Sequence, residues 1–108
     1  MFDKLTEALL SIGVPVSRFF ATKESDSYIV WGEDGQSKAF YANNKMALQT
    51  LTGGVHFFTK IEDDETFHKI QRALNESVGT WALEFVRCEG ALQYIHYKWN
   101  FEVENGTF

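Results

Sequence analysis

Three histidines and one cysteine are the side chains of this sequence best suited to acid–base, nucleophilic or metal chemistry: His56, His68, His96 and Cys88. A zinc site needs at least three ligands that meet in space, and such ligands often show short spacings such as HxxxH or CxxC. The sequence has neither spacing. His56 and His96 fall on the polar sides of two predicted strands, and His68 falls on a predicted helix. We therefore expect all three histidines to face solvent, and we expect no metal ion.

Four consecutive acids at residues 62–65 suggest either a cation site or a pair of catalytic carboxylates. An EF-hand loop needs acids at alternate positions, a central glycine and a distal glutamate, and these are absent here. The acids instead precede a helical pattern, where Asp63 or Asp64 can cap free N–H groups and the others favour the positive end of the helix dipole. The sequence therefore predicts a capping role for this segment.

The other candidate nucleophiles lack a recognisable motif. No motif surrounds Cys88, which we expect to be a partly buried free thiol. The chain has no GxSxG, and the glycine-containing stretch at residues 50–56 lacks the GK[ST] ending of a phosphate loop. We therefore predict no catalytic residues, no cofactor-binding residues and no enzymatic activity.

Composition predicts one acidic domain spanning residues 1–108. Hydrophobic residues make up 44% of the chain and aromatic residues 16%, enough apolar material for one core. The net charge of −5 and the scattered lysines and arginines argue against nucleic-acid binding, which needs a basic stripe. No stretch approaches the ~20 apolar residues of a membrane helix, and no N-terminal signal is present. We expect a soluble protein that is made and folded inside the cell.

The pattern of apolar residues predicts the order helix, two or three strands, helix, two strands. Helical spacing appears at about residues 3–12 and within residues 62–79. Strands are expected at residues 28–32, 38–43, 48–60, 81–88 and 92–104, and the first two are joined by a turn at Glu33–Ser37 that contains an Asp-Gly pair. This order predicts an α+β fold: a single twisted antiparallel β-sheet with two helices packed on one face.

The last strand, Leu92–Glu104, is unusually long. Its odd positions from Ile95 to Val103 are apolar and its even positions are polar. At ~3.3 Å per residue it would span about 43 Å, more than the roughly 34 Å diameter of a compact domain of this size. Such strands either bend, as Gly53 and Gly54 would allow in the 48–60 strand, or project with an uncovered edge that another chain can pair with. Geometry alone leaves both possibilities open.

Five ordered segments carry a resemblance that covers nearly the whole chain: "GVPVSRFF", "YIVWGEDG", "YANNKM", "GGVHFFTKIEDDETFHKIQRAL" and "YIHYKWNFEVE". The chain resembles the tail-completion or tail-terminator-like proteins, minor structural proteins of head–tail joining in long-tailed bacteriophages and prophages. The family motifs are matched by Val14-Pro15-Val16, by Phe57-Phe58-Thr59-Lys60 and by the strand from Tyr94 to Tyr97. Ala42-Asn43-Asn44-Lys45 departs at one position from an Ala-Asp-Asn-Lys-like stretch.

The resemblance implies an α+β structural protein that needs no cofactor and no active site. Members of this family are thought to form rings, often hexameric, at the head-proximal end of the tail tube, where they stop tube growth and meet the head connector. The implied partners are further copies of the chain, the tail-tube protein and the head connector protein. Assembly would take place in the host cytoplasm, and the protein would then stay in the virion tail. The alternative is a small prophage-encoded α+β binding or inhibitory module that acts as a monomer or dimer.

For a ring, we expect subunit contacts from three regions. These are the loop at Thr22–Ser27, the turn at Glu33–Ser37 and the polar side of the last strand. The candidate interface residues are Asp34, Gln36, His96, Lys98, Asn100 and Glu102.

Overall fold

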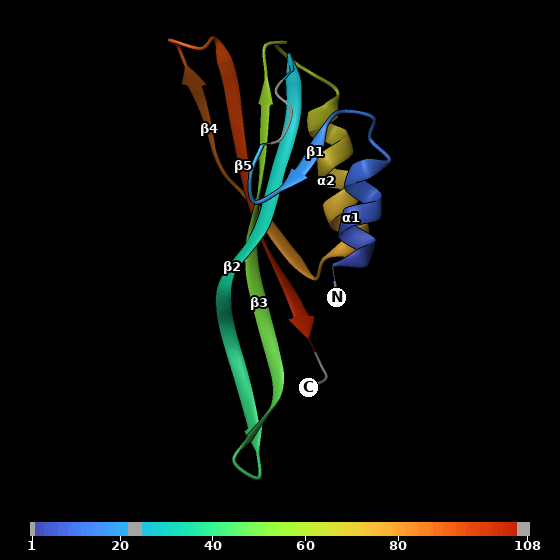
Figure 1. Ribbon diagram of the computed structural model, residues 1–108, viewed down its shortest axis with the longest axis vertical. Coiled ribbons are helices and arrows are strands. Elements are labelled where there is room, and N and C mark those ends of the chain that lie inside the picture. Colours follow the sequence, from blue (N-terminus) through green and yellow to red (C-terminus); the bar gives the residue numbers. More distant parts are fainter. Residues whose placement is uncertain (1, 22–24, 106–108) are drawn as a thin grey trace.

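The computed structural model describes residues 2–21 and 25–105, which form an elongated α+β molecule measuring 52 × 25 × 23 Å (Figure 1). The predicted α+β class is confirmed. None of the helices in these residues is long and apolar enough to cross a membrane. The elements, in chain order, are α1 (Asp3–Leu10), β1 (Val16–Arg18), β2 (Ser27–Ala42), β3 (Lys45–Thr59), α2 (Thr66–Ser77), β4 (Thr80–Glu89) and β5 (Tyr94–Asn105).

The five strands form one open sheet in the order β1-β2-β3-β5-β4. Every neighbouring pair is antiparallel except β1 and β2, which run parallel, with Val16 opposite Ile29. The prediction of a purely antiparallel sheet is therefore wrong at this edge. A parallel pair needs a crossover connection in place of a tight turn, and residues 19–26 lie between these two strands.

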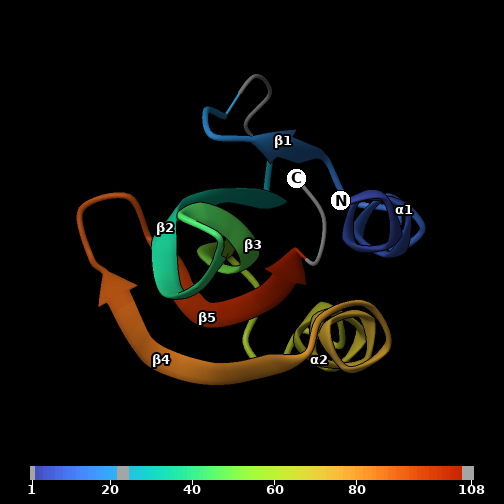
Figure 2. The same ribbon diagram turned by 90° about the horizontal axis from the view of Figure 1, so that it is seen from below.

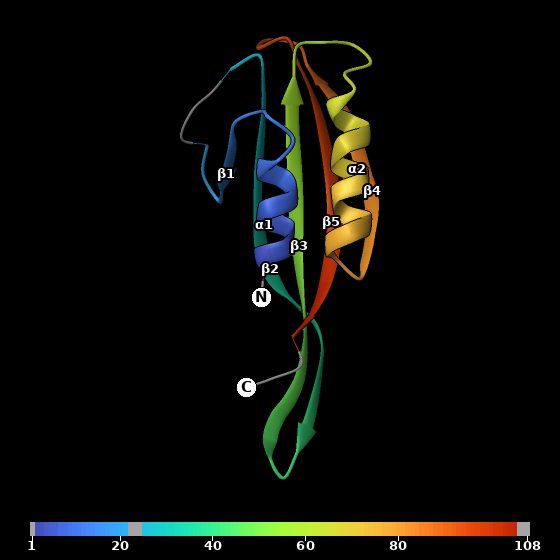
Figure 3. The same cartoon turned by 90° about the vertical axis from the view of Figure 1, so that its right-hand side faces the viewer.

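Both helices cover the same face of the sheet, as predicted, and they also pack against each other (Figure 3). Helical spacing puts Leu5 and Leu9 of α1, and Ile70 and Leu74 of α2, on the sides that face the sheet. The odd positions of β5 point toward the helices, and Trp99 and Phe101 are fully buried there. Because strand side chains alternate between faces, this side of β5 is core, as the sequence predicts.

The hairpin of β2 and β3 turns at Asn43 and Asn44, so the prediction of a turn at Glu33–Ser37 is wrong. Asn43 and Asn44 have φ values of 53° and 63°, the left-handed conformations that a two-residue type I′ turn requires. The Asp-Gly pair lies instead inside β2, where the pairing with β3 shifts register between Glu33 and Gly35. The chain therefore runs straight through its first turn signal and reverses at the second.

The far end of this hairpin projects from the body as a two-stranded arm, defined here as residues 37–48 (Figure 1). β1 pairs with β2 only from Ile29 to Trp31, and β5 pairs with β3 only as far as Gln49. β5 itself is an interior strand, and β4 covers it from Tyr94 to Glu102. Of the two possibilities that strand length leaves open, a projecting arm is therefore the one observed, and it comes from the β2–β3 hairpin and not from the last strand.

Gly53 lies where the sheet narrows toward the arm. It sits opposite Phe101 of β5, and seen from below β4 and β5 wrap around the β2–β3 ribbon (Figure 2). A Cβ atom at Gly53 would collide with the Phe101 ring and lie 2.6 Å from the Gly32 carbonyl oxygen. The glycine therefore permits a close approach of three strands.

Candidate functional site

The face of the sheet opposite the helices, here called the open face, carries most of the predicted interface residues. It is formed by one side of β2, β3, β5 and β4 (Figure 2). Alternation places the even positions of β5 on this face, because the odd positions point into the core. Its defining residues are Tyr28, Val30, His56, Phe58 and the even positions of β5 from Tyr94 to Glu104.

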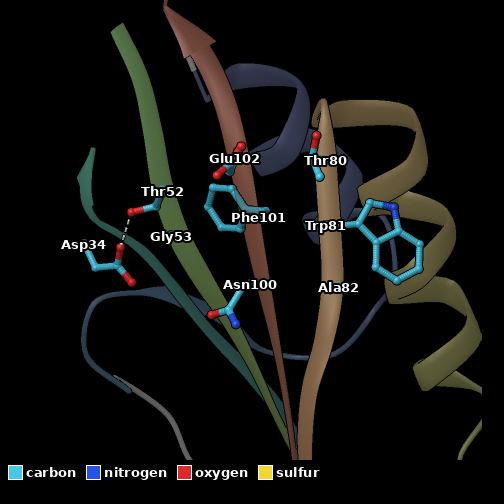
Figure 4. Close-up of a pocket in the computed structure, with 9 residues that line it drawn as sticks. All are labelled: Asp34, Thr52, Gly53, Thr80, Trp81, Ala82, Asn100, Phe101 and Glu102. Carbon is cyan, nitrogen blue, oxygen red and sulfur yellow. Dashed lines mark hydrogen bonds between the residues drawn. The ribbon is translucent and has the colours of Figure 1, made fainter. Parts of the chain in front are cut away.

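Three of the predicted residues, Asp34, Asn100 and Glu102, line one cavity of about 380 Å³ (Figure 4). Asp34 comes from β2, whereas Asn100 and Glu102 come from β5, so the fold joins residues far apart in sequence. The Asp34 Oδ1 atom accepts a hydrogen bond of 2.6 Å from the Thr52 hydroxyl. The wall of this cavity combines the carboxylates of Asp34 and Glu102 with the apolar side chains of Trp81, Ala82 and Phe101.

Gln36 and Lys98 lie outside this cavity. Gln36 stands at the base of the arm, where its Oε1 atom accepts a hydrogen bond of 2.7 Å from Gln49 Nε2. Lys98 Nζ lies 2.6 Å from a Glu84 carboxylate oxygen, and its side chain is 21% exposed. Lys98 is thus paired with Glu84 of the same chain and is less exposed than the sequence suggests.

His96 is buried, with 9% of its surface exposed, so the prediction of a solvent-facing histidine is wrong. Its ring stacks on Phe58 with centroids 4.2 Å apart and meets the edge of Phe85. These aromatic side chains cluster on the open face because β4 and β5 curl around the β2–β3 ribbon (Figure 2). A polar position of the alternating pattern is therefore enclosed by rings from β3 and β4.

His56, His96 and Glu89 form a chain of hydrogen bonds across β3, β5 and β4. His56 Nδ1 lies 2.8 Å from His96 Nε2, and His96 Nδ1 lies 3.0 Å from a Glu89 carboxylate oxygen. Because a carboxylate only accepts, His96 Nδ1 must carry a hydrogen, and the neutral ring then accepts from His56 through Nε2. Two neutral rings satisfy these hydrogen bonds. If both rings were protonated, His56 Nδ1 and His96 Nε2 would each carry a hydrogen, and the hydrogen bond between them would be lost.

Burial is the main cause that lowers the pKa of both histidines. The pKa of His56 falls from 6.5 to about 4 through burial, and then through the nearby His96 and Lys98 side chains, while Glu84 opposes the shift. Burial also lowers the pKa of His96, although Glu89 partly offsets this. At neutral pH both rings are therefore uncharged, and the contact between His96 and Glu89 is a hydrogen bond without an ion pair.

Acidification is expected to destabilise the protein through His56. An unfolded histidine takes up a proton near pH 6.5 but folded His56 does so near pH 4, so falling pH in this window favours the unfolded chain. A shift of this size amounts to about 3 kcal/mol for a fully buried group, and partial exposure of His56 reduces the expected loss to about 1–2 kcal/mol. Urea denaturation at pH 7.5 and pH 4.5 measures the loss.

The variant His56→Gln tests this assignment, because glutamine can still hydrogen-bond His96 but does not titrate. The loss of stability between the two pH values should shrink by about 1–2 kcal/mol in this variant. His68→Gln is the control, since His68 is exposed on α2. Equal losses in the wild type and in His56→Gln would show that His56 does not carry the effect.

Within the acidic segment at residues 62–65, Asp64 caps a free N–H group at the start of α2, as the sequence predicts. Asp64 Oδ1 accepts a hydrogen bond of 3.0 Å from the Thr66 N–H, and Oδ2 accepts from the hydroxyls of Thr59 and Ser27. Burial raises the pKa of Asp64, but these hydrogen bonds outweigh it and hold the pKa below its usual value. Asp64 therefore ties the start of α2 to the sheet, and Glu62, Asp63 and Glu65 remain exposed.

The prediction for His68 is confirmed, and the prediction for Cys88 is wrong. His68 is exposed, as expected, but Cys88 is exposed too and is not partly buried, because it lies on the outer strand β4. Within residues 2–21 and 25–105, no group of three histidine, cysteine or acidic side chains is placed to hold a metal ion.

In the predicted Thr22–Ser27 loop, residues 22–24 lie outside the described residues, and Ser27 begins β2.

The sequence allows for a projecting arm but does not place it at the β2–β3 hairpin or predict its exposed residues. The outer part of the arm exposes large apolar side chains, with Phe40 and Tyr41 each 59% exposed and Leu48 39% exposed. Two lysines, Lys38 and Lys45, accompany them, and the arm contains no acid. The Asn-Asn pair between two alternating segments is the signal that locates this turn.

Comparison with known proteins identifies no family for this chain. No model of a known protein family matches this chain, and no curated protein gives a significant match to it.

Proposed function

We propose that this chain is a structural protein of a phage or prophage tail, of the tail-completion or tail-terminator type. In this role several copies assemble into a ring at the head-proximal end of the tail tube, end tube growth and join the tail to the head connector. The sequence resemblance motivates the proposal. The work of the protein would then be done by its surfaces and its edges.

The projecting arm is the observation that carries the proposal. A two-stranded hairpin alone is at best marginally stable in water, and exposed strand edges with apolar side chains pair readily with other chains. Here the arm leaves the body with Phe40, Tyr41 and Leu48 uncovered. Ordering such a segment costs conformational entropy, and a partner that buried its apolar side chains would offset this cost, which favours a protein that works in an assembly.

The cavity on the open face also fits an assembly subunit. Asp34 on β2 and the pair Asn100 and Glu102 on β5 line this cavity from either side of β3 near the base of the arm, where a neighbouring polypeptide could add to the polar surface (Figure 4). Ring contacts that combine an apolar anchor with a polar rim are the usual anatomy of protein interfaces. We therefore retain these three residues, and not His96, as interface candidates.

The test is assembly on tail tubes. We expect the purified protein, mixed with the tail-tube protein of the same phage or prophage, to form rings that cap tube ends in negative-stain electron microscopy. The double variant Phe40→Ser with Tyr41→Ser should lose this capping while its circular dichroism stays that of the folded protein. Leu10→Ser is a matched control, because Leu10 on α1 is also 59% exposed but lies off the arm.

The outcome separates the two candidate functions. A protein that stays monomeric or dimeric both alone and with the tail-tube protein would refute the ring. That result would favour a small binding or inhibitory module. Loss of capping in Leu10→Ser to the same extent as in the arm variant would remove the special role of the arm.

A further inference from the structure

The two ends of the long axis differ in charge. The arm carries two lysines, Lys38 and Lys45, and no acid, although the whole chain has a net charge of −5. The arm lies at one end of the molecule, and the segment that joins β3 to α2 lies at the other (Figures 1 and 3). The long axis between these ends measures 52 Å. That segment contains the four acids at residues 62–65 and one lysine, Lys60. The molecule therefore has a basic end and an acidic end.

The tip of the arm groups its cations around an aromatic side chain. Lys38, Phe40 and Ala42 alternate along β2 and so share one face of the hairpin. Lys45 is the cross-strand partner of Ala42 and lies on that same face. All four residues are exposed. The arm thus presents two ammonium groups beside one exposed phenyl ring.

The acidic end contains a cavity of about 290 Å³ with the complementary chemistry. Asp63, Asp64, Phe67, His68 and Tyr97 line it. The rings of Phe67 and Tyr97 lie 5.0 Å apart between centroids and form an aromatic wall. An ammonium group is attracted both to the face of an aromatic ring and to a carboxylate.

The charge inside this cavity is negative enough to act on its own aromatic residue. Burial raises the pKa of Tyr97, and the carboxylates of Asp63 and Asp64 raise it further. Asp64 already accepts hydrogen bonds from Thr66, Thr59 and Ser27. Asp63 is exposed, and among the described residues no ion pair involves it, so its carboxylate is free to receive a cation.

We propose that the arm of one copy of this chain docks on the acidic end of a second copy, with the Lys45 ammonium group in the cavity beside Asp63. Phe40 would then cover the apolar surface around Phe67 and the exposed Ile61. The contact joins two different surfaces, so it is head-to-tail and repeats from copy to copy. Such contacts close into rings when the rotation between subunits allows it. The inference rests on the proposed ring assembly and names its contact.

Cross-linking between single-cysteine chains tests the contact directly, even when the affinity is low. Cys88→Ser removes the native thiol in every chain. Ala42→Cys then places a thiol at the arm tip without touching either lysine, and His68→Cys places one at the cavity. Glu76→Cys is the control, because it is exposed on α2 two turns from His68. One chain of each mixed pair carries a size tag, and disulfides are followed on non-reducing gels.

The Ala42→Cys and His68→Cys chains are expected to cross-link at least about tenfold faster than the Ala42→Cys and Glu76→Cys chains, because docking raises the effective concentration of the two thiols. Reversing the arm charge with Lys38→Glu and Lys45→Glu should slow the first reaction by about tenfold, since like charges then meet. Asp63→Asn should slow it as well. Equal rates at His68 and Glu76, or a rate unaffected by charge reversal, would overturn the proposal.

Failure of this contact is distinguishable from failure of the proposed function. Rings that still cap tail tubes without the specific cross-link would leave the function standing and remove only this docking mode. A specific cross-link without capped tubes would support this docking contact and remove the proposed tail function. The contact would then belong to another assembly of the chain.

Discussion

Replacing Trp99 with alanine is expected to lower the free energy of unfolding by about 3–5 kcal/mol, the range typical of buried tryptophans. Trp99 is fully buried at the centre of β5, between the sheet and α2. Its ring lies 5.4 Å from that of Phe67, and its Nε1 donates a hydrogen bond of 3.2 Å to Gln71. The alanine variant would leave a large cavity and remove the hydrogen bond to Gln71. Since domains of this size have only about 5–15 kcal/mol of stability, the loss should be conspicuous.

Urea denaturation followed by circular dichroism measures this loss as a lower midpoint at unchanged slope. Trp81→Ala is the matched control, because Trp81 lies on the outer strand β4, is only partly buried and hydrogen-bonds the exposed side of α2 through Asn75. We expect it to cost clearly less. Trp99→Phe keeps a ring in place, so its loss of stability should lie between those of Trp81→Ala and Trp99→Ala. The ranking of core and surface positions can then be measured even if Trp99→Ala is largely unfolded. An equal cost for Trp81→Ala and Trp99→Ala would contradict the placement of the core.

The fold class and the core of β5 follow from the sequence because they depend on local patterns. Alternation by two is set by backbone geometry, and any strand packed on one side must show it. Ile95, Trp99 and Phe101 therefore reveal the core side without knowledge of the neighbouring strands. The two helices are equally clear, since apolar residues at helical spacing precede Gly13 in one case and Gly79 in the other.

The position of the first hairpin turn depends on long-range pairing, and this is why the prediction is wrong. Asp34-Gly35 and Asn43-Asn44 both suit a type I′ turn, so local chemistry offers two solutions. The observed register places Ile29 opposite Phe57 and Trp31 opposite Val55, which buries all four side chains on the helix side. A turn at Asp34 would forfeit this pairing. Tertiary burial thus selects the second turn and lengthens the hairpin into an arm.

The candidate site is only partly visible in the sequence for a related reason. Asp34, Asn100 and Glu102 are polar positions of strands, and the fold does bring them to one cavity. His96 fits the same polar pattern, yet Phe58 and Phe85 enclose it. The difference comes from the curl of β4 and β5, which shelters one half of the open face and leaves the other half accessible. Sheet curvature is a property of all strands together and has no signal at one residue.

Replacing Gly53 with alanine is expected to destabilise the protein by about 2–3 kcal/mol, although alanine is usually preferred to glycine inside a strand. The added methyl group would meet the Phe101 ring on one side and the Gly32 carbonyl oxygen, at 2.6 Å, on the other. The ring can shift, but the carbonyl belongs to the backbone of β2 and cannot move without separating β2 from β3. The cost therefore comes from forcing apart the strands at the point where the arm leaves the body.

Gly54→Ala is the matched control, because it makes the same chemical change one position along β3. There the nearest atom to the new Cβ would be the flexible end of Lys98, at 3.2 Å, which can move aside. We expect this variant to be close to neutral, and urea denaturation compares the two. A double-mutant cycle with Phe101→Leu separates the two contacts: if the ring contributes, Gly53→Ala costs less in the Phe101→Leu background, and the remaining cost belongs to the Gly32 carbonyl. Equal stabilities of Gly53→Ala and Gly54→Ala would show that the three strands do not meet at Gly53, and the arm would then lack a fixed base.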